Sequence, residues 1–383
     1  MLSKILRNII ITERFDMNIL LKYASMAIVA ASLIGCGDDC AKDKKCADKD
    51  RVEYSAKVAA DTQLVVFINN IDNPAFAPVF EVYKKALAND IAKGESEAKE
   101  FKAFLKEAGL DNSKMNWCVA SIGKLDLSNI QRLHNVSNIS VVFNVKHDGG
   151  KLFAAVSNKT NNLDNIKFEE IEVSGVKSLK CPTPLTDRIS ATYFTSINDQ
   201  LMVFAGSEEI LKTQIALYRD NADASTKFDD LLNDKNLILG GAVSDVGAIL
   251  AKAEKSESRD MTKESALLNQ INYKEFKTLD FGLKADKSGA VTVFSNLETR
   301  DTKDAEVLAA MLKMIHMTAI AQFTQFRDTA NSSDARSDIN LLLEVLNTVD
   351  IKAEGAKAAV KIPVPQKAID FCVEELERKL LGK

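Results

Sequence analysis

The sequence predicts an α+β protein with two similar lobes, each an antiparallel sheet with flanking helices. Short apolar runs rich in β-branched residues are bounded by turn residues, which is typical of antiparallel strands. Longer segments between them carry apolar residues at helical spacing. The order strand, helices, antiparallel strands, helix occurs twice, once in residues 58–233 and once in residues 234–383. These two ranges are therefore the expected lobes.

An apolar run near the start of the chain is typical of a secretory signal peptide. Residues 23–34 follow Lys22 and number about a dozen, whereas a membrane-spanning helix needs roughly 20. A basic residue, a short apolar run and small residues at its end are what a cleaved signal requires. We therefore expect residues 1–35 to be removed. Acidic residues lie close before the run, so Met17 is the expected start.

Four residues at the end of this run, Leu33, Ile34, Gly35 and Cys36, resemble the lipobox of bacterial lipoproteins. The resemblance implies cleavage before Cys36 and a diacylglycerol or palmitate anchor on that residue. It also implies a location at the bacterial cell envelope, on the periplasmic or the surface face. Two acyl chains hold a protein on a membrane far more firmly than one. An ordinary signal peptide, with Cys36 a plain thiol, is the alternative.

Residues 36–57 are expected to form a flexible tether between the anchor and the body. They are rich in Asp and Lys and have hardly an apolar side chain. Such a stretch cannot bury enough surface to offset the entropy lost on ordering. A simple spacer is one interpretation, and a signal for export to the cell surface is the other.

Six cysteines are present, and five remain if Cys36 carries lipid, so at least one lacks an intramolecular partner. Disulfides persist in exported proteins. The expected pairs are Cys40 with Cys46 and Cys118 with Cys181, which leaves Cys372 buried on a C-terminal helix. Metal binding by Cys40 and Cys46 is the alternative, but no histidine follows at zinc-finger spacing. No metal or cofactor is predicted.

The first lobe is expected to begin with a strand at residues 64–68 and two helices, the second ending at Gly109. Further strands are predicted at residues 117–122, 139–145, 151–156, 168–173, 176–181, 189–197 and 201–205. Gly149 and Gly150 follow Asp148 and predict a hairpin between residues 139–145 and 151–156. Ser207 then caps a helix.

The second lobe is predicted to follow the same scheme. Its expected strands are residues 237–243, 276–285, 290–297, 349–353 and 356–362. Its expected helices start near residue 246, span 303–327 and 334–347, and close the chain through Cys372. The hairpin at 276–297 is the expected counterpart of the one at 139–156.

Three short phrases are similar to sequences in a family of exported bacterial proteins known only as a domain of unknown function. They are residues 58–62 before the first strand, residues 109–111 before Trp117, and residues 201–211. Members often carry Pro where this chain has Ala59. The resemblance implies an exported body and supplies no active-site residues.

No catalytic motif is found in the sequence. His134, His147 and His316 lie on different predicted elements, and none has the second histidine four residues away that a zincin helix requires. Gly206 and Ser207 lie between a strand and a helix, but the second glycine of a nucleophile elbow is missing. We interpret Ser207 as a helix cap. A formal net charge of −4 speaks against nucleic-acid binding.

The helix at residues 303–327 has a wider apolar surface than a surface helix needs. Met311, Met314 and Met317 are flexible side chains that suit adaptable contacts, and with Phe323 they are candidates for lining a groove. A central helix packed on two sides is the alternative. The sequence therefore predicts a non-catalytic lipoprotein that binds a protein or polymer partner. A lipid carrier or sensor is the second hypothesis, and a hydrolase the third.

Overall fold

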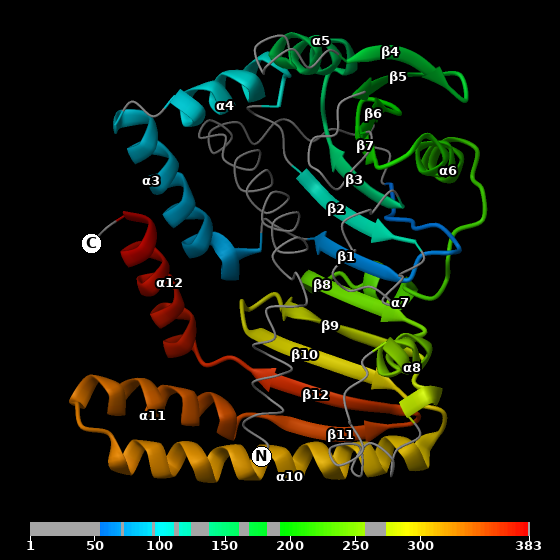
Figure 1. The fold of residues 1–383 in the computed structure, drawn as a ribbon. Helices are drawn as coiled ribbons and strands as arrows, with labels where there is room; N and C mark the ends of the chain where they lie inside the picture. The colour runs from blue at the N-terminus through cyan, green and yellow to red at the C-terminus, as the bar shows by residue number, and fades with distance from the viewer. Residues whose placement is uncertain are drawn as a thin grey trace.

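The computed structural model describes residues 54–69, 73–93, 96–110, 115–123, 138–160, 168–181, 192–256 and 273–381. Within these residues all twelve strands form one antiparallel sheet (Figure 1). Helices pack along it, so the predicted α+β class is confirmed. The predicted signal peptide, the lipobox and residues 36–53 of the tether lie outside the described residues.

The strands form two sets that meet in the middle of the sheet. The first set is β1 (Leu64–Asn69), β2 (Met115–Ile122), β3 (Ile139–Val145), β4 (Glu169–Val173), β5 (Val176–Cys181), β6 (Thr192–Ser196) and β7 (Leu201–Ala205). The second set is β8 (Leu237–Ser244), β9 (Thr278–Ala285), β10 (Val291–Glu298), β11 (Asp350–Glu354) and β12 (Lys357–Pro363). Outward from the middle, the strand orders are β1-β2-β3-β7-β6-β5-β4 and β8-β9-β10-β12-β11. Apart from the added β4–β5 hairpin, the order of the first set is that of the second.

The two sets are joined by backbone hydrogen bonding. β1 and β8 pair antiparallel, from Leu64 opposite Val243 to Ile68 opposite Leu239. The sheet is therefore continuous across the junction between the two expected lobes. Division of the chain into two similar lobes stays a prediction, with the repeated strand order in its favour.

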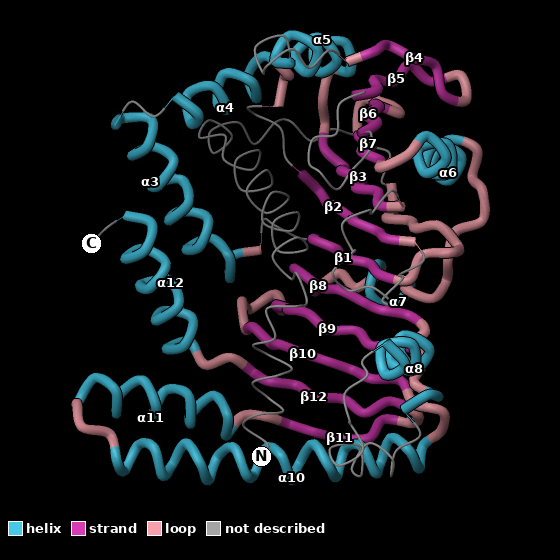
Figure 2. The backbone as a smooth tube through the Cα atoms, viewed as in Figure 1, coloured by secondary structure: helices cyan, strands magenta, loops and turns pink. Residues whose placement is uncertain are grey.

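Six helices form an arch along one side of the sheet (Figures 1 and 2). In spatial order they are α10 (Thr302–Thr329), α11 (Ser333–Asn347), α12 (Gln366–Leu381), α3 (Ala77–Lys93), α4 (Ser96–Glu107) and α5 (Gly149–Thr160), and each contacts the next. The remaining described α-helices are α6 (Glu208–Arg219), α7 (Asp229–Leu232) and α8 (Val246–Ser256). Short 3-10 helices lie at Pro74–Phe76 and Tyr273–Glu275.

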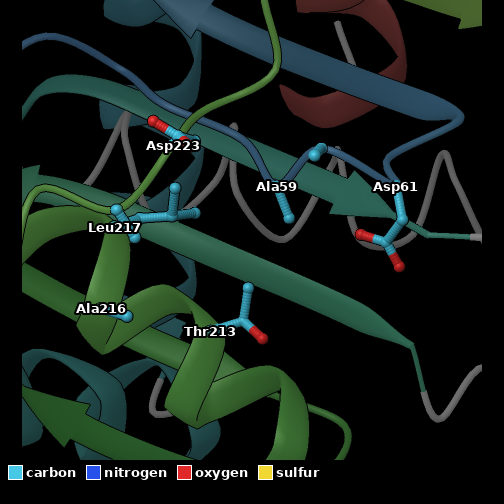
Figure 3. Close-up of a pocket in the computed structure, with 8 residues that line it drawn as sticks. Ala59, Asp61, Thr213, Ala216, Leu217 and Asp223 are labelled. Carbon is cyan, nitrogen blue, oxygen red and sulfur yellow. The ribbon is translucent and has the colours of Figure 1, made fainter.

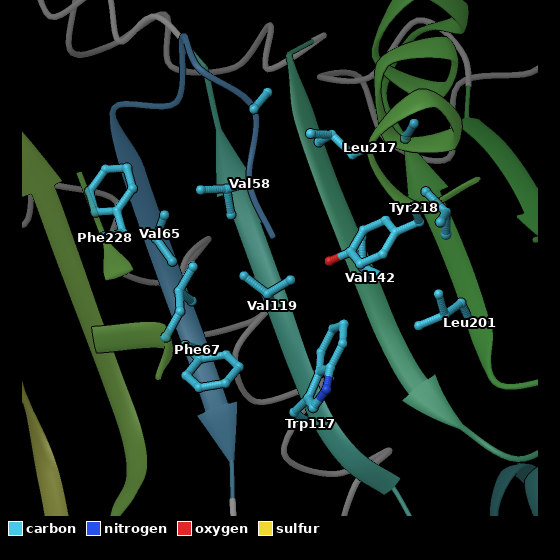
Figure 4. Close-up of a cluster of buried hydrophobic side chains, with 14 of the residues drawn as sticks. Val58, Val65, Phe67, Trp117, Val119, Val142, Leu201, Leu217, Tyr218 and Phe228 are labelled. Carbon is cyan, nitrogen blue, oxygen red and sulfur yellow. The ribbon is translucent and has the colours of Figure 1, made fainter. Parts of the chain in front are cut away.

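One face of the sheet carries the larger core. Alternation along the strands places Phe67, Trp117 and Val142 on this face (Figure 4). They belong to one buried cluster with Leu211 and Ile215 of α6. The chain before β1 closes the same core, because the indole Nε1 of Trp117 donates a hydrogen bond of 2.8 Å to the Tyr54 carbonyl. Ser207 begins α6 as predicted, and its hydroxyl accepts from the Ile210 amide.

The opposite face is covered by α4 and α5. Ile68 and Cys118 point to this face and pack with Leu105 of α4 and with Leu152 and Phe153 of α5. Gly109 has a φ of +71° just after α4, as the helix-ending glycine was expected to have. Each helix thus buries one apolar side, and α4 does so as its periodicity predicts.

The predicted hairpin between residues 139–145 and 151–156 is wrong. The second segment is part of α5, and the place beside β3 is taken by β7. Asp148 explains the difference, because its carboxylate accepts a hydrogen bond of 3.1 Å from the Lys151 amide and so acts as a helix cap. Leu152 and Ala155, three residues apart, are then buried on one side of the helix.

The predicted disulfide between Cys118 and Cys181 is not formed, and both residues are buried thiols. Cys118 lies on β2 and Cys181 on β5, with three strands between them. Four strand spacings amount to about 19 Å, whereas a disulfide needs Cα atoms within about 7 Å. Burial raises the pKa of the Cys118 thiol, which keeps it protonated.

Cys372 was expected to be buried but is exposed on α12. Cys40 and Cys46 lie outside the described residues.

Candidate binding surface

The first part of α10 is an integral part of the fold. Asp301 caps the helix, its carboxylate accepting a hydrogen bond of 3.0 Å from the Asp304 amide. Ala305, Leu308 and Ala309 are buried, and Leu308 packs in a cluster with Phe276 and with Ala358 of β12. This end of α10 is therefore fixed against the edge of the sheet formed by β11 and β12.

The rest of α10 extends past the sheet (Figure 1). Its 28 residues give a helix of about 42 Å, whereas the five residues of β11 span only about 17 Å. Beyond the edge, α11 is the described element that packs against it. The imidazole Nε2 of His316 joins the two helices, since it lies 2.8 Å from the Leu346 carbonyl oxygen. The two helices form a projecting hairpin.

One side of α10 is both apolar and exposed. Residues at successive spacings of three and four define what we call the outer stripe: Val307, Ala310, Met314, Met317 and Ala321, all exposed. Met314 and Met317 are 53% and 61% exposed. Phe326, near the C-terminal end of α10 and outside the stripe, is 56% exposed. Lys313 is the sole Lys, Arg, Asp or Glu between Val307 and Phe326. The outer stripe is therefore an apolar surface nearly free of charge.

By length and composition, α10 is the one helix among the described residues that is long and apolar enough to cross a membrane. The mean hydropathy of its most apolar window is 1.4, and 6% of that window is buried. A core helix of this composition would be mostly buried. Exposure of such a helix is the feature that most needs a functional explanation.

The four residues predicted to line a groove are divided between the two sides of α10. Met311 is half-buried and packs beside the Leu308 cluster. Phe323 is half-buried, with its ring centroid 6.1 Å from that of Phe326. Met314 and Met317 point outward. The expectation of a helix packed on two sides is not met among the described residues, since α10 packs with β11, β12 and α11 on one side.

Further exposed apolar residues lie on the sheet, where the sequence analysis did not select them. Phe281 of β9 and Val293 of β10 are 45% and 37% exposed. The Phe281 ring lies over Gly241 of β8, where an added Cβ would come within 2.9 Å of it. The alternating pattern identifies these residues as facing one side of the sheet, but it does not show that the side is uncovered.

In the described part of the chain, neither the histidines nor the recesses bring the side chains of a catalytic site together. His147 is buried on the chain after β3 and lies 2.8 Å from the Val145 carbonyl and 2.7 Å from the Ser196 hydroxyl. His134 lies outside the described residues. A recess of about 360 Å³ beside α6 has Asp61 and Asp223 at opposite ends (Figure 3). No group of three or more potential metal ligands occurs among the residues described.

A second recess, of about 260 Å³, lies on the sheet beside β9 and β10. Its two lysines are already engaged, Lys284 with Asp234 at 2.5 Å and Lys361 with Glu354 at 2.8 Å. Their charges are thus neutralised within the fold. This recess is a weaker candidate than the outer stripe.

Because His147 is buried, we expect the free energy of unfolding to depend on pH. Burial lowers the pKa of His147 below its ordinary value of 6.5, against the opposing effects of the Val145 carbonyl and Asp199. Below pH 6.5 the unfolded chain therefore binds a proton that the folded chain resists, and stability falls as the pH drops. Urea unfolding at pH 7.5 and 5.5 should show a smaller loss for His147→Gln than for the wild type. Equal losses would contradict this assignment.

No family model matches this chain, and no curated protein does. Among solved structures, the chain is similar to crystal form I of TP0453, with 9% identity and a TM-score of 0.35. The similarity covers 84% of this chain and 99% of that chain. A similarity at this level gives no argument about function.

Proposed function

We propose that the protein is a lipid-anchored lipoprotein of the bacterial cell envelope whose body binds a partner without catalysing a reaction. The lipobox-like residues Leu33, Ile34, Gly35 and Cys36 support the anchor. The observation that carries the binding role is the outer stripe, an apolar helix surface left exposed on a projecting hairpin. The most apolar patch on a protein surface is often a binding site.

The apolar side chains of the outer stripe and its low charge indicate what kind of partner it can bind. A protein or polymer partner is the first expectation from the sequence. Because Lys313 is the one charged residue between Val307 and Phe326, a highly charged polymer would find few counter-charges along the stripe. Met314 and Met317 adapt to apolar surfaces of different shape. The stripe therefore suits an apolar partner.

The anchor is tested by metabolic labelling with an alkyne analogue of palmitate. Wild-type protein should be labelled and sediment with membranes, and Cys36→Ala should lose the label and appear in the soluble fraction. Cys372→Ala is the matched control, because Cys372 is an exposed thiol far along the chain and its loss should leave labelling unchanged. Equal labelling of wild type and Cys36→Ala would refute the anchor.

A lipid carrier or sensor is the second candidate, and Phe281 and Val293 favour it. Both present exposed apolar side chains on one face of the sheet. Native mass spectrometry of the protein purified without its anchor would detect a lipid bound in fixed proportion. Protein without bound lipid, taken from several growth conditions, would argue against this candidate.

A further inference from the structure

We infer that the outer stripe of α10 docks on the lipid bilayer that carries the anchor, with the helix lying flat on the membrane surface. The inference rests on the proposed lipid anchor and names the partner of the stripe as phospholipid. An interfacial helix buries an apolar side a few ångströms into the boundary between headgroups and acyl chains. The outer stripe presents such a side, with Met314 and Met317 at its centre.

The packing of α10 determines that the helix lies on the bilayer and does not cross it. Its inner side holds the buried residues Ala305, Leu308 and Ala309, and His316 ties it to α11. Crossing a membrane would require the helix to leave both the sheet and α11. Docking on the outer stripe leaves these contacts intact.

The area of the stripe favours a bilayer over a second copy of the chain. From Val307 to Ala321 the stripe is about 21 Å long, and at a width of about 10 Å it covers roughly 210 Å². Two copies would bury about 420 Å² in total, below the roughly 1,200 Å² of stable specific interfaces. A bilayer needs no complementary partner shape and can accept a narrow stripe.

The charges around the stripe predict which lipids it binds. Glu306 and Lys313 flank it on the same side and offset each other, and Arg327 at its end pairs with Asp328 at 2.8 Å. The whole chain is mildly acidic. Docking should therefore depend on apolar burial and show no preference for anionic lipid.

The tether makes a weak contact sufficient. Between Cys36 and the first described residue, Tyr54, the chain can reach at most about 60 Å. A body held within that distance of the membrane has a high effective concentration for it. The anchor thus adds to a docking that the stripe also supports without it.

The experiment uses residues 36–383 carrying Cys36→Ala, so that lipidation cannot supply the binding. Flotation with phosphatidylcholine vesicles, with or without 20% phosphatidylglycerol, should recover this protein in the lipid fraction to a similar extent in both. Met314→Asp with Met317→Asp should reduce the partition coefficient at least tenfold. Phe371→Asp with Leu380→Asp is the matched control on α12, where both side chains are also exposed, and its partition should stay within twofold.

Circular dichroism should show all three proteins equally folded, which separates lost docking from lost structure. With Cys40, Cys46 and Cys372 replaced by serine, a dye attached at Met317→Cys should shift its emission to the blue when vesicles are added. Absence of flotation, equal loss in the α12 control, or a dimer formed through the stripe in light scattering would each overturn the inference. If the wild-type protein is labelled at Cys36 but the Cys36→Ala protein does not float with vesicles, the docking inference fails and the anchor stands. If the Cys36→Ala protein floats but the wild type is not labelled, the anchor fails and the docking inference stands.

Discussion

Replacing Trp117 by alanine should lower the free energy of unfolding by about 3–5 kcal/mol, the range for removing a large buried aromatic ring. Trp117 is 6% exposed and lies between Phe67 and Tyr218, with ring centroids 6.4 Å and 6.2 Å away. Its removal leaves a cavity at the centre of the larger core. It also leaves the Tyr54 carbonyl without the indole donor, which loosens the segment before β1.

Denaturant unfolding followed by circular dichroism measures this change. Tryptophan emission is unsuitable for the comparison, because Trp117 is the single tryptophan of the chain. Phe326→Ala is the control, since that ring is 56% exposed and its loss should change stability by no more than about 0.5 kcal/mol. Equal effects of the two substitutions would show that the core is not centred on Trp117.

Gly247→Ala should destabilise the protein by about 2–3 kcal/mol, because the added methyl group has no space. A Cβ at Gly247 would lie 2.2 Å from the Lys274 carbonyl oxygen and 2.7 Å from that of Tyr273. Both are backbone atoms and cannot rotate away. The Gly247 amide also donates a hydrogen bond of 2.9 Å to the Phe276 carbonyl, which fixes the two segments at this separation. The clash outweighs the higher helix propensity of alanine, about 1 kcal/mol.

Gly123→Ala is the matched control for Gly247→Ala. At Gly123 the nearest atoms to an added Cβ, on Asn138 and Asp61, are 3.4 Å away and belong to side chains. Its substitution should therefore cost much less, and thermal unfolding of the two variants side by side measures the difference. A larger effect at Gly123 would mean that the approach of α8 to residues 273–276 is not as close as described.

Local features of the fold are predictable from the sequence because they depend on neighbouring residues. Ser207 caps α6, and Gly175 and Gly355 occupy turn positions with φ of +73° and +61°, as the turn sequences indicate. The same kind of reasoning failed at Asp148, since an acidic residue before two glycines suits a hairpin turn and a helix cap alike. Whether residues 151–156 form a strand or a helix depends on which segment pairs with β3, and β7 takes that place.

Long-range arrangement is not predictable in this way. The order of strands places three others between Cys118 and Cys181, and no local pattern encodes that separation. The apolar character of α10 is evident from its sequence, but which side faces solvent depends on where β11 ends. Met311 and Met314, three residues apart, therefore differ in burial although their sequence surroundings are alike.

The pairing of β1 with β8 has a consequence for the integrity of the whole molecule. Both strands lie at the centre of the sheet and are hydrogen-bonded on both sides, so neither set of strands ends there in an edge. A polypeptide divided between α7 and β8 would give two fragments, each with an unsatisfied row of amides and carbonyls at its border. Such rows recruit other chains. Loss of the outer β4–β5 hairpin would, by contrast, only move an existing edge of the sheet to β6.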